Sequence, residues 1–164
     1  MKYSVKKKNR ALTPLVGFAD LIAGMEQRGD RVAYKYPEGR EFVTLSYGAF
    51  AHKAKCVAAG LSAAGLAGSR IAIIGETSPE WVATYLGTIA GGGVAIPMDK
   101  EVAVPELEGF MTFAEADAVV FTSCMNEKFK ETVENHPTVK YFIPVSTDKL
   151  SYLHHEKIRE FDDI

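Results

Sequence analysis

The sequence lacks the residues that staple small secreted domains or hold structural metals. Its 164 residues include only 2 cysteines, Cys56 and Cys124, whereas a disulfide framework or a zinc site needs more thiols, or histidines at ligand spacing. Cys56 lies inside a helical pattern and Cys124 follows a strand-like run. We therefore expect both to be buried, reduced thiols rather than nucleophiles.

Long apolar runs and a charge excess of one sign are also missing. No uncharged apolar run reaches the roughly 20 residues that a membrane span needs, and the longest candidate, residues 56–68, is short and rich in Gly and Ala. No signal-type apolar segment follows the N-terminal basic residues, so we expect a cytoplasmic protein. The 19 basic residues are spread along a chain of net charge −2, which argues against nucleic acid as a partner.

What is present is the composition of an ordinary globular domain. The chain is 47% hydrophobic and 24% charged, and its length allows one core without staples. We expect three segments: a basic tail over residues 1–13, an α/β unit over residues 14–147 and a charged C-terminal tail over residues 148–164. We interpret the basic tail as solvated; contact with a membrane surface or nucleic acid is the alternative.

The first third of the chain predicts a helix, a hairpin and a longer helix. Apolar residues at helical spacing predict a short helix over residues 15–25. Two β-rich runs, residues 31–36 and 42–46, flank a Pro-Glu-Gly-Arg turn and predict a hairpin. From Tyr47 the spacing of apolar residues changes to four and three, which predicts a helix that ends near residues 65–68.

From residue 70 onward, strands and helices alternate. Apolar runs centred on Ala72, Ala95, Val120 and Ile143 lie 23, 25 and 23 residues apart, and each gap holds one helical pattern. Parallel strands need helical crossovers of about this length, and they read as continuous apolar runs because both faces are covered. The pattern predicts an α/β fold, a doubly wound, mainly parallel sheet with helices on both faces, with the hairpin outside it.

The helix predicted over residues 79–90 has the clearest start. Ser78 is placed to cap it, with Pro79 at its first position. Because its apolar residues surround most of its circumference, we expect Trp81 and Leu86 to be largely buried. The two later helices should turn their apolar stripes inward, namely Leu107, Phe110, Met111 and Ala114 in one and Met125, Phe129 and Val133 in the other.

Ligands of doubly wound sheets bind beyond the carboxyl ends of the strands. Here those segments are residues 75–78, 98–104, 122–126 and 146–149. The chain has no G-x-G-x-x-G, P-loop, G-x-S-x-G or H-E-x-x-H motif, so dinucleotide, P-loop and hydrolase sites have no anchor. We therefore predict no catalytic, cofactor-binding or metal-binding residue in the chain.

The remaining polar candidates have ordinary structural interpretations. Ser78 could present helix amides to a phosphate or carboxylate, but a capping role is preferred. The glycines of residues 87–93 precede a strand, which favours a helix stop and close packing. His154-His155 lacks a companion cysteine or carboxylate pair for a metal, and His52 and His136 are expected to be solvated.

Three segments carry a resemblance to a known family. They are residues 42–47 (FVTLSY) before a long helix, residues 76–81 (ETSPEW), and residues 86–99, whose glycine-rich run ends in AIPMD. In sequence, order and spacing they resemble the opening third of AMP-binding acyl-CoA synthetases of the adenylate-forming superfamily. The resemblance covers roughly residues 18–145, and in that family these motifs are structural.

The resemblance implies ATP-dependent activation of a carboxylate to an acyl-adenylate, with Mg²⁺, and then transfer to the thiol of coenzyme A. The family uses a Ser/Thr/Gly-rich phosphate loop ending in Lys, an aromatic and acidic adenine and ribose site, and a Lys of a mobile C-terminal domain. None of these segments matches the present residues, so no catalytic residue can be transferred. The 164 residues should be inactive alone, and the implied partners are the remainder of a ligase chain and a carboxylic acid, with a mild preference for a long-chain fatty acid.

Two other interpretations stay open, a stand-alone α/β domain that binds a small molecule and a degenerate protein kept as an interaction module. A reading frame that continued past Ile164 into a Gly/Ser/Thr-rich loop would favour the ligase fragment, and a stop codon there would favour the other two. Because apolar faces and a sheet edge would contact later segments of a full enzyme, we also expect the isolated piece to associate with itself.

Overall fold

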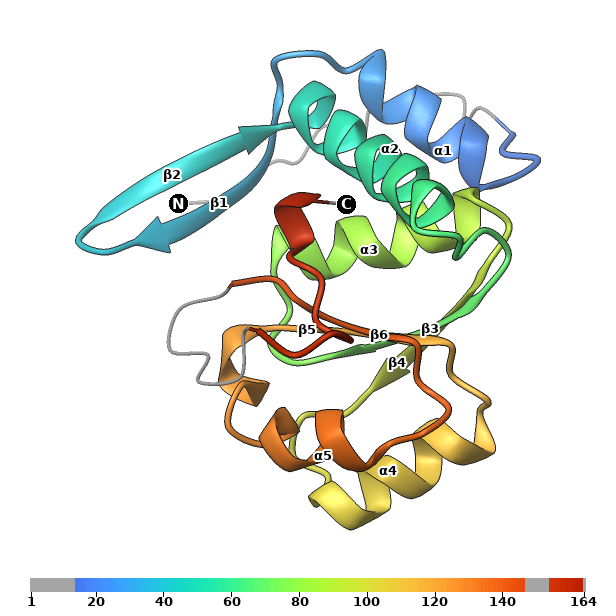
Figure 1. The fold of residues 1–164 in the computed structure, drawn as a ribbon. Helices are drawn as coiled ribbons and strands as arrows, with labels where there is room; N and C mark the ends of the chain where they lie inside the picture. Colours follow the sequence, from blue (N-terminus) through green and yellow to red (C-terminus); the bar gives the residue numbers. More distant parts are fainter. Residues whose placement is uncertain (1–13, 147–153, 164) are drawn as a thin grey trace, which may run out of the picture.

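The computed structural model describes residues 14–146 and 154–163 (Figure 1). A parallel sheet of order β4-β3-β5-β6 lies between two layers of helices, and a separate antiparallel hairpin, β1-β2, projects to one side. This arrangement confirms the predicted fold class. The basic tail proposed for residues 1–13 lies outside the described residues, as do residues 148–153 and 164 of the proposed C-terminal tail.

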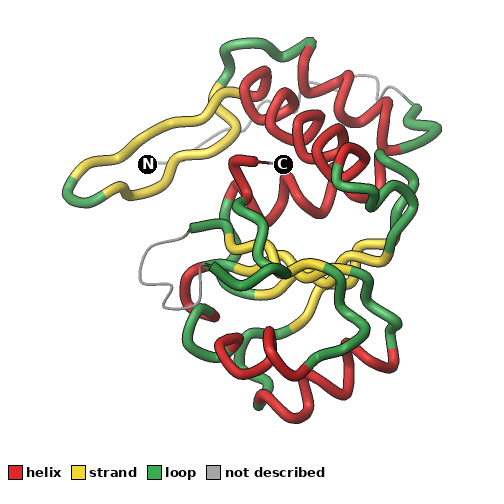
Figure 2. The backbone as a smooth tube through the Cα atoms, viewed as in Figure 1, coloured by secondary structure: helices red, strands yellow, loops and turns green. Residues whose placement is uncertain are grey.

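The elements follow one another along the chain almost as the sequence pattern indicates (Figure 2). In chain order they are α1 (Phe18–Glu26), β1 (Val32–Glu38), β2 (Glu41–Ser46), α2 (Tyr47–Ala63), β3 (Arg70–Ile74), α3 (Pro79–Ala90), β4 (Val94–Met98), α4 (Val104–Phe113), β5 (Ala118–Phe121), the 3₁₀ turn η1 (Ser123–Met125), α5 (Phe129–Asn135), β6 (Tyr141–Pro144) and the 3₁₀ turn η2 (Phe161–Asp163).

The four predicted strand centres each lie in a parallel strand. Ala72 pairs with Ile96 of β4 on one side and with Val119 of β5 on the other, and Ile143 of β6 pairs with Val120. The last four residues of β3 are fully buried. An apolar residue at every position is what a strand requires when helices cover both of its faces.

The helices divide into two groups around the sheet (Figure 1). α1, α2 and α3 cover one face, where Phe50, Leu61 and Ile71 belong to one apolar core. α4 and α5 cover the other face, where Leu107 and Phe129 belong to a second core. Among the described residues, no helix is both long and apolar enough to cross a bilayer.

The two edges of the sheet differ. At β6, Phe142 donates its N–H to Lys157 O at 2.8 Å and accepts from Arg159 N at 3.1 Å, while Ile158 between them is buried. At β4, Val94 donates its N–H inward to Ser69 O at 2.9 Å. Because backbone N–H groups alternate in direction along a strand, the backbone nitrogen of residue 97 points outward, and as a proline it has no N–H to donate. An edge with a missing donor is a poor template for another strand, and the self-association expected from the sequence stays a prediction.

Leu86 is buried as expected, and Trp81 is partly buried against the core, stacked on Tyr85 with ring centroids 6.0 Å apart. Two other predictions about the helices need correction. Phe110 was expected inward and is 53% exposed, since the face of α4 that reaches the sheet is narrower than its apolar stripe. The single helix predicted around Met125 is split into η1 and α5, although the three residues of its stripe are buried.

α2 and α3 approach closely at Gly87, as predicted for this glycine. A Cβ at this position would lie 2.6 Å from Ala54 O and 2.9 Å from Val57 Cβ. The nearest atom belongs to backbone and cannot rotate away. The glycine therefore fixes the distance between the two helices that cover one face of the sheet.

We expect Gly87→Ala to destabilise the fold by about 1–3 kcal/mol, the usual cost of overpacking. Gly24→Ala is the matched control, because Gly24 is also inside a helix but has no atom within 4 Å of an added Cβ. The control should stabilise by about 0.5–1 kcal/mol through helix propensity. Urea unfolding measures both changes, and effects of the same sign would contradict the packing argument.

Candidate functional site at the carboxyl ends of the strands

The loops that follow β3 and β5 touch at the carboxyl edge of the sheet. Glu76 donates its N–H to Thr122 Oγ1 at 2.9 Å. Gly75 has a φ of 129°, and a Cβ there would lie 1.9 Å from the same hydroxyl oxygen. Glycine is therefore required at position 75 for both conformation and space, and the Thr122 hydroxyl holds the two loops together.

The lysines at this edge are engaged by neighbouring groups. Lys100, which follows β4, lies with its Nζ 3.0 Å from Glu76 Oε1 and 3.7 Å from Glu101 Oε1. The hydrogen bond to Glu76, and then the charge of that carboxylate, raise the pKa of Lys100. Lys128 Nζ donates to Lys100 O at 2.7 Å. These contacts link the ends of β3 and β4 to the segment before α5.

The N-terminus of α3 is closed by its own side chains. Ser78 Oγ accepts from Trp81 N at 3.1 Å, which confirms the capping role. The carboxylate of Glu80 accepts from its own N–H, from Ser78 and from Lys53 Nζ, the last at 2.9 Å. Burial raises the pKa of Glu80, but these hydrogen bonds and the charge of Lys53 outweigh burial and lower it. A phosphate approaching this helix end would meet a carboxylate already seated there.

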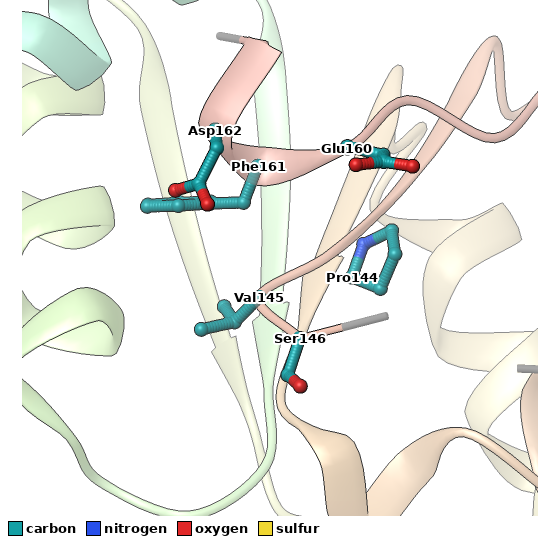
Figure 3. Close-up of a pocket in the computed structure, with 6 residues that line it drawn as sticks. All are labelled: Pro144, Val145, Ser146, Glu160, Phe161 and Asp162. Carbon is teal, nitrogen blue, oxygen red and sulfur yellow. The ribbon is translucent and has the colours of Figure 1, made fainter. Parts of the chain in front are cut away.

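A cavity opens where β6 ends beside the C-terminal segment (Figure 3). Its volume is about 170 Å³, less than the roughly 300–1,000 Å³ of typical small-molecule sites. Figure 3 shows that its walls come from two crossing segments, one holding Pro144, Val145 and Ser146 and the other Glu160, Phe161 and Asp162. Two of its six lining residues are acidic, so it has neither the size nor the sign for a nucleotide.

The prediction that both cysteines are buried is wrong. Both are exposed. Cys124 Sγ lies 3.4 Å from Thr122 Oγ1 at the carboxyl edge, and Cys56 Sγ lies 3.5 Å from His52 Nε2 on α2. The second contact could have been found in the sequence, because residues four apart meet on one face of a helix.

His136, expected to be solvated, is buried. Its Nε2 lies 3.3 Å from Thr112 Oγ1 and its Nδ1 3.2 Å from Thr138 Oγ1. Thr112 donates its own hydroxyl proton to Glu108 O at 2.9 Å. The Thr112 oxygen is then left to accept, so His136 donates from Nε2 and ties α4 to the end of α5.

The other histidines lie at or near the surface. His52 is exposed as predicted, His154 is exposed, and half-buried His155 accepts from Lys157 N at 3.2 Å through Nδ1. Within residues 14–146 and 154–163, no group of three or more His, Cys, Asp or Glu side chains could hold a metal ion.

With the geometry established, comparison with known proteins places the chain. It matches the AMP-binding enzyme family over residues 22–162. Among curated proteins it is similar to the polyketide synthase–nonribosomal peptide synthetase hybrid himA of Aspergillus japonicus, with 29% identity over 126 residues, which are 73% of this chain and 3% of that protein.

Solved structures share the fold. Coronafacic acid ligase from Pectobacterium brasiliense is similar with a TM-score of 0.77 and 14% identity, over 90% of this chain and 29% of that chain. The anthranilate CoA ligase AuaEII, solved with anthranoyl-AMP, is similar with a TM-score of 0.71 and 17% identity, over 82% of this chain and 26% of that chain. The present chain thus spans less than a third of these proteins' length.

The hydroxyl of Thr122 can be tested against a close pair of variants. Thr122→Val keeps the shape but leaves Glu76 N–H without its acceptor, and we expect a loss of about 1–3 kcal/mol. Thr122→Ser keeps the oxygen and should cost clearly less. Urea unfolding of both variants measures the difference, and a Thr122→Ser loss as large as the Thr122→Val loss would show that the hydrogen bond to Glu76 is not the dominant contribution of this side chain.

The Lys53–Glu80 pair predicts a pH-dependent contribution to stability. Because the folded-state pKa of Glu80 is lowered from its ordinary 4.5, the contribution is present above that value and is lost as pH falls through the folded-state pKa. Lys53→Met should therefore cost about 0.2–1 kcal/mol at pH 7, and this difference should shrink in acid.

Lys55→Met is the control, since Lys55 pairs with Glu26 at 2.6 Å and both side chains are more exposed than those of the first pair. It should cost less at pH 7. Thermal melts between neutral and acidic pH provide the measurement. A Lys53→Met loss that stayed constant in acid would trace to packing of the lysine stem instead of its charge.

Proposed function

The chain belongs to the AMP-binding enzyme family, and from this we propose that it is the N-terminal portion of an ATP-dependent acyl-CoA synthetase. Such an enzyme converts a carboxylate to an acyl-adenylate and then to a thioester of coenzyme A. The observation that carries the proposal is the family match over residues 22–162. The likeness of its fold to two solved ligases, with TM-scores of 0.71 and 0.77, supports it.

The residues described do not fit the triphosphate of ATP. Adenylation needs cations, Mg²⁺ ligands and a backbone cradle held in one place. Here Lys100 is paired with Glu76, and the start of α3 is filled by the carboxylate of Glu80. In the proposed enzyme this region acts as a scaffold, and ATP, Mg²⁺ and coenzyme A are held by other segments.

The partner that the surface favours is the remainder of a longer ligase chain. Phe110 and Phe113 of α4 are 53% and 90% exposed, and Val94 at the open edge of the sheet is 52% exposed. Exposed large apolar side chains on adjoining turns are typical of surfaces that another segment covers. Self-association of the isolated piece through the same side chains is the competing proposal, and a cytoplasmic location remains the expectation of the sequence.

For the carboxylic acid that the enzyme activates, we propose a class wider than fatty acids. A fatty acid is the preference taken from the sequence resemblance. The similar structures include ligases whose names specify coronafacic acid and anthranilate, so aromatic and alicyclic acids belong beside aliphatic ones in any substrate panel.

We expect the 164-residue chain to show no ATP binding by calorimetry and no ATP–pyrophosphate exchange. The longest reading frame that encodes these residues should exchange pyrophosphate with at least one acid of a panel of aliphatic and aromatic carboxylic acids, and should then form the acyl-CoA. Micromolar ATP binding to the 164 residues would contradict the scaffold role. A reading frame that ends at Ile164, or a longer chain inactive with every acid, would favour a stand-alone binding or interaction domain.

A further inference from the structure

α2 carries a paired thiol and imidazole on its solvent face. Cys56 and His52 are four residues apart and both are exposed, while Phe50, Ala54 and Val57 of the same helix are buried in the core. The distance from Cys56 Sγ to His52 Nε2 is 3.5 Å. Neither residue is among those described above at the carboxyl edge of the sheet.

The contact has the geometry of a nucleophile beside a base. A neutral imidazole has one ring nitrogen with a free lone pair, and at this distance Nε2 can take the thiol proton as sulfur attacks. The nearest lysines on the same helix are already paired, Lys53 with Glu80 and Lys55 with Glu26. His52 is therefore the group that contacts the thiol directly.

We propose that Cys56 is a modification site that forms mixed disulfides with small-molecule disulfides, with His52 as the proton acceptor. The Cys56 sulfur forms a new S–S bond to one sulfur of the reagent as the reagent's own S–S bond breaks. The thiol proton passes to His52 Nε2 and then to the leaving thiolate or to water. The disulfide is the oxidant and is itself half-reduced, so atoms and electrons balance.

Cys124 provides an internal comparison. It is exposed as well and lies close enough to Lys100 for their charges to interact, but the side chain that its sulfur contacts directly is the Thr122 hydroxyl, at 3.4 Å. A hydroxyl is not a base at neutral pH, and this one already accepts the N–H of Glu76. Two accessible thiols of one chain thus differ in whether an imidazole touches them.

The test measures each thiol separately with the aromatic disulfide dithiobis-nitrobenzoate, whose released thiolate is coloured. Cys124→Ser leaves Cys56 as the reacting thiol, and Cys56→Ser leaves Cys124. At neutral pH we expect Cys56 to react faster, and adding His52→Gln to Cys124→Ser should slow Cys56 by about tenfold, near the low end of positioned acid–base effects because the pair is exposed. His154→Gln, which removes an exposed histidine elsewhere, should leave the rate unchanged.

The dependence of the rate on pH gives a second readout on the Cys124→Ser protein. Adding His52→Gln should change the shape of this pH–rate profile, because it removes the proton acceptor, whereas adding His154→Gln should not. Circular dichroism checks that His52→Gln keeps its helix. An unchanged Cys56 rate in His52→Gln, a pH–rate profile whose shape His52→Gln leaves unchanged, or a faster reaction at Cys124 would each overturn the proposal.

Discussion

The burial of β3 on every side is the constraint on which the remaining structure depends. Ile71 to Ile74 are fully inaccessible to solvent, their main chain pairs with β4 and β5, and helices lie over both faces (Figure 1). A strand this apolar is stable only when two neighbours satisfy its peptide groups and two helical layers exclude water. The close approach of α2 to α3 at Gly87 then fixes the packing of one helical layer. The contact of Gly75 with Thr122 fixes the carboxyl end of the sheet.

The same constraint explains why the fold was predictable from sequence. Continuous apolar runs around Ala72 and Val120 indicated buried parallel strands, and Ser78-Pro79 marked the start of α3, which begins at Pro79. These signals are local, since each depends on residues within one turn or one strand. The family resemblance rested on the same segments and is confirmed at the level of the AMP-binding enzyme family.

What the sequence could not supply depended on contacts between distant residues. His136 was expected to be solvated, but it is buried, and its two ring nitrogens hydrogen-bond to the hydroxyls of Thr112 in α4 and Thr138. Phe110 shares a helical stripe with Leu107, but only Leu107 reaches the sheet. At the candidate site, the Lys100–Glu76 pair joins residues from two different loops, and no spacing rule within either loop predicts it. The absence of a phosphate-binding motif was visible in the sequence. That the Glu80 carboxylate, paired with Lys53, lies at the start of α3 could be learned only from the structure.

The contrast between the two sheet edges bears on how a longer chain would be completed. The β6 edge is closed by main-chain hydrogen bonds with Lys157 and Arg159, so it needs no further strand. The β4 edge faces outward, and Pro97 removes the donor that an added strand would use there. A segment that covered this side could therefore pair with β4 only in part and would have to gain its stability mainly by covering apolar side chains such as Val94. Side-chain packing is less tolerant of a wrong partner than a ladder of peptide groups, because it depends on shape as well as on polarity. Pro97 thus discourages indiscriminate strand addition at this edge.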